Sequence, residues 1–132
     1  MIKSVNGATF RRMVLSGSKT LSANKDYVDS LNVFPVPDGD TGTNMSMTIA
    51  SAAREVSECS TNSMASLCAA FSKGALKGAR GNSGVITSQI VKGITDVLSA
   101  KEEFTAKDFA NALAKGTEVA YKAVTKPKEG TI

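Results

Sequence analysis

Hydrophobic residues recur every three or four positions along most of the chain, and no segment of useful length alternates with the two-residue period of a strand. This spacing predicts an all-α protein with about six helices. The expected apolar stripes are, in chain order, Phe10, Met13, Val14, Gly17 and Leu21; Tyr27, Val28 and Leu31; Met45, Ile49, Ala52 and Val56; Met64, Leu67, Cys68, Phe71 and Ala75; Ile86, Ile90, Ile94 and Val97; and Phe109, Leu113, Gly116, Ala120 and Ala123.

Two loops rich in glycine or proline interrupt this pattern. The first, NVFPVPDGDTGTNMS, starts at Asn32 and leads into the third helix, which is expected to begin near Thr43. The second, GALKGARGNSG, covers residues 74–84, and its shortness predicts that the fourth and fifth helices are antiparallel neighbours. Thr105 and Asp108 have the spacing of a capping box and predict the start of the sixth helix.

Size and composition fit one globular domain, residues 1–132. Hydrophobic residues make up 42% of the chain and charged residues 21%, which is typical of a folded protein. No apolar run approaches the roughly 18 residues that a membrane span needs, and the first residues lack a signal-peptide stretch. We therefore expect a cytoplasmic protein with no membrane span.

The chain contains no histidine, and its two cysteines have no metal-ligand spacing. We expect both to be free thiols, Cys68 in a core and Cys59 near a helix end. The missing histidine excludes Ser-His-Asp and Cys-His catalysis and histidine-based zinc sites. Any catalysis must therefore use carboxylates, hydroxyls, amides, lysine, metal ions or backbone dipoles.

The net charge is +4, from 16 Lys and Arg against 12 Asp and Glu. Such a mild surplus suits a nucleotide, a nucleic acid or an acidic partner, and it equally suits a solvated helix face and tail. Residues 78–81 match the G-x-x-G of KH domains, but that fold needs strands that the pattern does not predict. Nucleic acid is therefore not the expected partner.

The first loop places two carboxylates one residue apart, at Asp38 and Asp40. Pro35 and Pro37 stiffen the approach, and Gly39 lets both side chains converge on one point. Two hard oxygen ligands suit Mg²⁺, which takes its other ligands from water and phosphate. The alternative is a Pro-Asp-Gly turn without chemistry. A calcium-binding EF-hand starting at Asp38 is excluded, because three of its required positions hold unsuitable residues: Gly42, Thr43 and Ile49.

Both loops also lead into helix N-termini, whose unpaired N–H groups and positive dipole end attract phosphate. For the second loop the alternative is a plain turn between helices with Asn82 or Ser83 as the N-cap. Neither loop is a P-loop, since the G-x-x-x-x-G-K-[ST] motif does not occur and no predicted strand precedes either one. A nucleotide site in this chain would have to be all-helical.

Together, NVFPVPDGDTGTNM and GARGNSGVITSQI closely resemble the amino-terminal kinase domain of the bacterial fatty acid kinase family. That domain is similar to the nucleotide-binding L subunit (DhaL) of dihydroxyacetone kinases. The opening VNGATFRRM and the helix pattern extend the resemblance over essentially all 132 residues. It implies an antiparallel up-and-down helical barrel that binds ATP or ADP with two Mg²⁺ ions at one end.

The resemblance also implies the roles of the loop residues. Asp38 and Asp40 would be the catalytic metal ligands, and Asn32 would be a further ligand near the place where dihydroxyacetone kinases use an aspartate. Thr41 stands where those kinases carry a histidine. The nucleotide-binding residues would be Thr41, Gly42, Thr43, Asn44, Arg80, Gly81, Asn82 and Ser83, although Arg80 fits a structural role equally well.

The implied reaction transfers the γ-phosphoryl group of ATP to a fatty acid carboxylate that a separate fatty-acid-binding carrier protein presents. A carboxylate is already ionised at neutral pH, so the reaction needs positioning and charge neutralisation rather than a general base. Two alternatives are an L-type domain of a dihydroxyacetone kinase and a regulatory module that keeps the fold without catalysis.

Family members continue beyond a segment such as KPKEGTI with further helices that complete the barrel. We therefore expect a domain truncated before its last helices, with doubtful activity by itself. Its apolar flank would favour self-association into a homo-oligomer.

Overall fold

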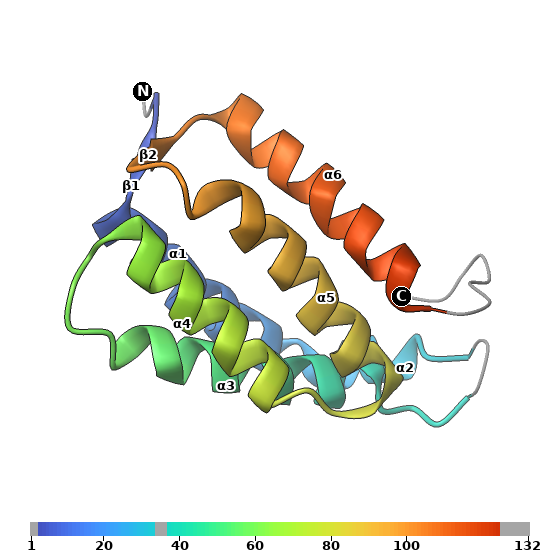
Figure 1. Ribbon diagram of the computed structural model, residues 1–132. Helices are drawn as coiled ribbons and strands as arrows, with labels where there is room; N and C mark the ends of the chain where they lie inside the picture. The colour runs from blue at the N-terminus through green and yellow to red at the C-terminus, as the bar shows by residue number, and fades with distance from the viewer. Residues whose placement is uncertain (1–2, 34–36, 125–132) are drawn as a thin grey trace.

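The computed structural model describes residues 3–33 and 37–124. Six helices and two very short strands make up this part of the chain, which confirms the all-α fold (Figure 1). The elements are, in order, β1 (Val5–Asn6), α1 (Gly7–Ala23), α2 (Lys25–Ser30), α3 (Thr41–Ser57), α4 (Met64–Lys77), α5 (Gly81–Leu98), β2 (Glu103–Phe104) and α6 (Ala106–Ala123).

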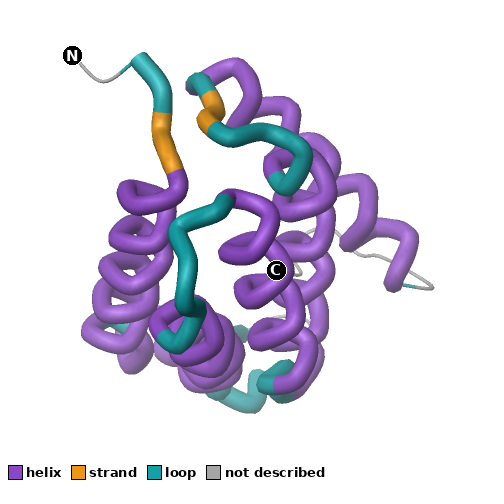
Figure 2. Tube along the Cα trace, turned by 60° about the vertical axis from the view of Figure 1, so that its left-hand side comes forward, coloured by secondary structure: helices purple, strands orange, loops and turns teal. Residues whose placement is uncertain are grey.

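The long helices form a bundle in which α3 and α5 are the central members. Helix α3 contacts α1, α2, α4 and α5, and α5 also packs against α4 and α6. The contact between α4 and α5 confirms that they are neighbours, and α6 lies along the outer side of α5 (Figures 1 and 2). At one end β1 pairs antiparallel with β2, with Val5 opposite Phe104. Strands of two residues are too short to produce an alternating pattern, so the sequence did not predict them.

A cluster of aromatic rings forms the centre of the core. Phe10 meets Phe71 and Phe104 edge-on, with 5.9 Å between ring centroids in each pair, and Phe104 stacks on Phe109 at 6.0 Å. Cys68 is buried in the same core, as predicted, and Cys59 lies just past the end of α3; both are free thiols. This core joins α1, α4 and α6 into one packed unit.

Parts of three predicted apolar stripes are wrong. On α1 the buried residues include Phe10, Val14 and Ser18, whereas Met13 is 44% exposed. This helix packs mainly against α3, so only a narrow strip of its surface is covered. Helix α2 has no buried residue at all. The predicted stripe residues that are exposed are Met13, Gly17, Tyr27, Leu31, Leu113 and Ala123.

Helix α6 begins and packs as the sequence predicts. Thr105 accepts a hydrogen bond from the Asp108 N–H at 3.2 Å, and the Asp108 carboxylate accepts one from the Thr105 N–H at 2.9 Å, which completes the capping box and lowers the pKa of Asp108. Further along, α6 crosses α5 closely, because a Cβ on Gly93 would lie 2.6 Å from the backbone nitrogen of Gly116. Glycine at both positions makes this approach possible.

Arg11 fastens α1 to the connection between α3 and α4. Its guanidinium group donates to the carbonyl oxygens of Val56 at 2.7 Å, Cys59 at 2.8 Å and Thr61 at 2.8 Å, and to Asn62 Oδ1 at 2.9 Å. These acceptors include carbonyls at the C-terminal end of α3, where a positive charge is also favourable.

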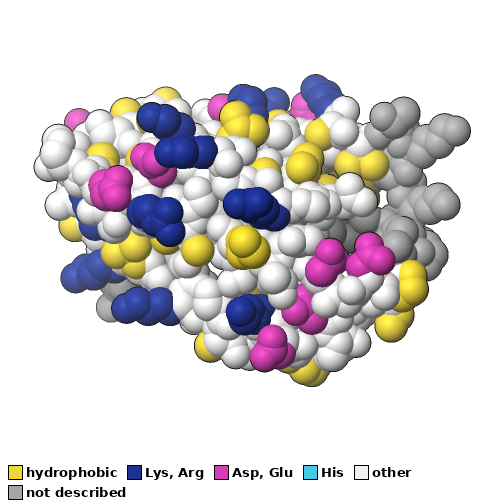
Figure 3. Space-filling model, turned by 90° about the horizontal axis from the view of Figure 1, so that it is seen from below, with side chains coloured by type: hydrophobic (Ala, Val, Ile, Leu, Met, Phe, Trp, Pro, Cys, Tyr) yellow, Lys and Arg dark blue, Asp and Glu magenta, His cyan; other side chains and the backbone are white. Residues whose placement is uncertain are grey.

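The surface of the molecule carries mixed charge on the face seen in Figure 3. Most basic side chains lie over the left and centre of this view, two acidic ones lie among those on the left, and further acidic side chains gather at the lower right. Among the described helices, none combines the length and the hydropathy needed to cross a membrane.

Candidate functional site

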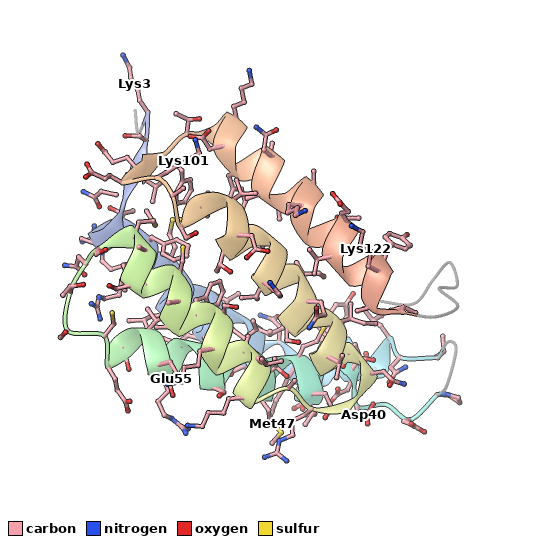
Figure 4. All side chains as sticks on the ribbon, viewed as in Figure 1. Lys3, Asp40, Met47, Glu55, Lys101 and Lys122 are labelled. Atoms are coloured by element: carbon pink, nitrogen blue, oxygen red, sulfur yellow. The ribbon has the colours of Figure 1, made fainter. Side chains whose placement is uncertain are left out.

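The two loops that the sequence singled out meet at the same end of the bundle. Asp40 directly precedes α3, and Figure 4 shows it at the end of the molecule opposite Lys3 and Lys101. The Ser83 hydroxyl, in the first turn of α5, donates to the Thr41 carbonyl at 3.2 Å. The N-termini of α3 and α5 are therefore in direct contact.

Asn44 and Gly81 also lie close together at this junction. Gly81 has a positive φ of 65°, and a Cβ at this position would run into the side-chain amide of Asn44, with Asn44 Cγ at 3.1 Å. The structure thus brings together two residues that were predicted to face the phosphates of a nucleotide. It also gives a reason for glycine at position 81, where both the backbone angle and the space require it.

Thr48 fastens the second loop to α3, and the sequence reasoning missed it. Its buried hydroxyl donates to the Asn44 carbonyl at 2.8 Å, the Gly78 carbonyl lies 3.4 Å from the same hydroxyl, and the hydroxyl accepts from the Arg80 N–H at 3.3 Å. The only sequence signal was a polar residue one helical turn after Asn44. These bonds hold the backbone just before α5 against α3.

The acidic turn has the shape that its glycine suggested. Gly39 has a φ of 67°, and both Asp38 and Asp40 are exposed. Asp40 is the N-cap residue of α3, but its side chain makes no capping hydrogen bond to the helix. The side-chain oxygen of Asn32 accepts from the Asp40 N–H at 3.1 Å, so all three predicted metal ligands lie in or beside this turn. Pro35, part of the predicted brace, lies outside the described residues.

Asp29, on α2, belongs to the site and was also missed. Its carboxylate accepts from the Thr43 hydroxyl at 2.6 Å and from the Thr43 N–H at 2.8 Å. The hydrogen bond from the Thr43 hydroxyl is the main cause that lowers the pKa of Asp29, with further contributions from the N–H groups of Thr43 and Gly42. Asp29 thus caps α3 from a neighbouring helix.

This capping explains where α3 begins. The helix starts at Thr41, two residues before the predicted position near Thr43. Both hydrogen-bond donors of Thr43 that a phosphate would use are bound to Asp29 in this structure.

The N-terminus of α5 differs from that of α3. Its N-cap is Arg80, which makes no side-chain capping bond, so the alternative in which Asn82 or Ser83 is the N-cap is wrong. Gly81, Asn82 and Ser83 form the first turn, and the first two are exposed. A helix start without a side-chain cap presents N–H groups and the positive end of the helix dipole to an anion.

The donor set of the acidic turn would suit magnesium better than a structural zinc ion. Within residues 3–33 and 37–124, no three side chains of the types His, Cys, Asp and Glu gather into a cluster. Two exposed carboxylates and one amide oxygen suit an ion that keeps several waters and takes phosphate oxygens as ligands. A closed cage of protein ligands, as structural zinc needs, is not formed by these residues.

Known proteins resemble this chain over its whole length. Residues 35–132 match the family model of the DAK2 domain. The chain is 53% identical over 131 residues to protein YloV of Bacillus subtilis, and this alignment covers 99% of this chain and 24% of YloV. It is 51% identical over 132 residues to an uncharacterized protein of Staphylococcus epidermidis, covering 100% of this chain and 24% of the relative. The chain therefore spans about a quarter of the length of these curated relatives.

Proposed function

This chain belongs to the DAK2 domain family, and from this premise we propose that it is the Mg-ATP-binding domain of a kinase that phosphorylates fatty acids. Membership supports a nucleotide-binding module of the DhaL type. The substrate proposed here is a fatty acid carboxylate held by a separate carrier protein. The observation that supports the proposal is the hydrogen bond from the Ser83 hydroxyl, in the first turn of α5, to the Thr41 carbonyl, directly after the acidic turn. Through this contact the proposed metal ligands would lie beside a helix start that has no side-chain cap.

In this proposal Asp38 and Asp40 hold Mg²⁺. Asn32, whose side-chain oxygen accepts from the Asp40 N–H, is the proposed further ligand. When bound, Mg²⁺ supplies charge neutralisation for the β- and γ-phosphates. The exposure of both carboxylates and the missing capping bond of Asp40 support this role.

The nucleotide-binding residues come from both helix starts. The first turn of α5 offers the N–H groups of Gly81, Asn82 and Ser83 to the phosphates, and the Asn44 side chain adds a polar contact from α3. Thr41, Gly42, Thr43 and Arg80 complete the predicted set around this junction.

The chemistry asks little of the side chains beyond placement. A fatty acid carboxylate is ionised at neutral pH and needs no base to remove a proton, which agrees with a chain that contains no histidine. Phosphoryl transfer to such an acceptor depends on alignment and on stabilising the charge of the transferred group. The chain contributes by holding the nucleotide and excluding alternative orientations of its phosphates.

Titration calorimetry of the full-length protein with ADP and Mg²⁺ tests the site. Asp38→Ala and Asp40→Ala should each weaken Mg²⁺-dependent binding by on the order of 100-fold, as expected when a charged ligand is removed. Asp26→Ala, an exposed acid on α2, is the charge-matched control and should bind normally. Unchanged binding in both site variants would contradict the metal site.

The proposed substrate needs a separate assay. The full-length protein should turn over ATP in the presence of a fatty acid and its carrier protein. Turnover with dihydroxyacetone instead would move the protein to the dihydroxyacetone kinases. Nucleotide binding without turnover of either acceptor would favour a regulatory module.

A further inference from the structure

We propose that Asp29 is a positioning residue for the acidic turn, an inference that rests on the function proposed above. Its side chain and its backbone together hold the two chain segments that flank Asp38 and Asp40. Removing the carboxylate should therefore weaken magnesium binding although Asp29 touches neither the ion nor the nucleotide in this proposal.

The first contact is a pair of hydrogen bonds from Thr43, in the segment after the turn, to the Asp29 carboxylate. One carboxylate oxygen accepts from the Thr43 N–H at 2.8 Å, and the other accepts from the Thr43 hydroxyl at 2.6 Å. Hydrogen bonds to an ionised acceptor are shorter and stronger than neutral ones. Because Thr43 lies in the first turn of α3, this pair fixes the start of that helix relative to α2.

The second contact holds the segment before the turn. The backbone carbonyl of Asp29 accepts from the Asn32 N–H at 3.1 Å. The side-chain oxygen of Asn32 in turn accepts from the Asp40 N–H at 3.1 Å. Asp29 is thus connected to both Asn32 and Thr43, and through Asn32 to Asp40 itself.

Helix α2 packs against α3 without a fully buried side chain. It is six residues long and has no buried residue. Its close contact with α3 is at Gly42, where an added Cβ would lie 2.8 Å from Val28 Cβ. Val28 is only half-buried, so the polar contacts of Asp29 add to this packing in aligning α2 with α3.

The test compares Asp29→Asn with Asp26→Asn in the full-length protein. Both remove one carboxylate from α2 and keep the side-chain size, but only Asp29 binds Thr43. The measured quantity is the Mg²⁺ concentration that gives half-maximal ADP binding. We expect it to rise on the order of tenfold in Asp29→Asn and to stay at the wild-type value in Asp26→Asn. A merely structural role would change the melting temperature and leave this midpoint unchanged.

Amide hydrogen exchange of the nucleotide-free protein provides the second measurement. The Thr43 and Asp40 amides should exchange faster in Asp29→Asn than in Asp26→Asn. An unchanged Mg²⁺ midpoint in Asp29→Asn overturns the proposal, and so does unchanged exchange at Thr43. If the wild-type protein binds no nucleotide with Mg²⁺, the proposed function fails and the positioning role fails with it. Faster exchange would then still identify the contact itself as real.

Discussion

Replacing Gly81 by alanine tests the junction between the two loops. Gly81 has a φ of 65°, in the left-handed region where a residue with a Cβ costs about 1–2 kcal/mol more than glycine. The new Cβ would also displace the side-chain amide of Asn44, and moving that side chain away from its preferred rotamer adds about 0.5–1 kcal/mol. We therefore expect Gly81→Ala to lower the free energy of unfolding by about 2 kcal/mol, or about 8 °C in melting temperature.

Gly17→Ala is the matched control, because it makes the same chemical change inside α1. No atom lies within 4 Å of a Cβ added at Gly17. Alanine is the better residue in the interior of a helix by roughly 0.5–1 kcal/mol, so this variant should be more stable than the wild type.

Thermal unfolding followed by circular dichroism measures both variants. The two glycine substitutions should shift the melting temperature in opposite directions. An unchanged or raised melting temperature for Gly81→Ala would refute the reasoning, because it would mean that neither the backbone angle nor the contact with Asn44 constrains position 81.

Two further predictions concern the fold around the site. Arg11→Met should destabilise the protein by about 3 kcal/mol, because it removes charged hydrogen bonds to the partly buried carbonyls of Val56 and Cys59, each contributing about 1.5 kcal/mol. The control Arg12→Met, at an exposed position, should change stability by less than about 0.5 kcal/mol. Equal urea midpoints for the two variants would contradict this prediction. Burial raises the pKa of the Cys68 thiol from 9.0 to about 11. Above pH 9 the unfolded chain therefore loses a proton that the folded chain keeps, and the free energy of unfolding should fall from pH 9 to pH 11. Cys68→Ala should lack this part of the pH dependence of the urea midpoint.

The sequence was sufficient to predict the helices but not which side of each helix is covered. Periodic apolar positions identify an amphipathic helix regardless of its partner, which is why all six helices were predicted. Met13 and Leu113 belong to such periodic stripes and are 44% and 43% exposed. Their exposure depends on how many neighbours each helix has, and this is a property of the assembled bundle. The same limit applies to Tyr27 and Leu31 on the short helix α2.

In the site, too, the sequence identifies residues by their type but not those that act through tertiary contacts. Asp38, Asp40 and the glycines of both loops could be selected because their residue types and local order are unusual by themselves. Asp29 could not, since its partner Thr43 lies 14 positions later, beyond the acidic turn. Thr48 was missed for the same reason, because its contact with Arg80 spans 32 positions. Residues that act by holding others are visible only once the chain is folded.

The N-termini of α3 and α5 differ in charge and capping, which suggests different roles for them in the proposed site. At α3, Asp29 occupies the donors of Thr43 and adds a negative charge, which opposes a phosphate at that position. At α5, the N-cap residue Arg80 leaves the first turn without a side-chain cap and adds a positive charge nearby. We therefore expect the phosphates to bind mainly at α5, while α3 serves to aim the two aspartates. The prediction that Thr43 itself contacts phosphate then requires that the nucleotide displace Asp29, whereas Gly81, Asn82 and Ser83 need no such exchange.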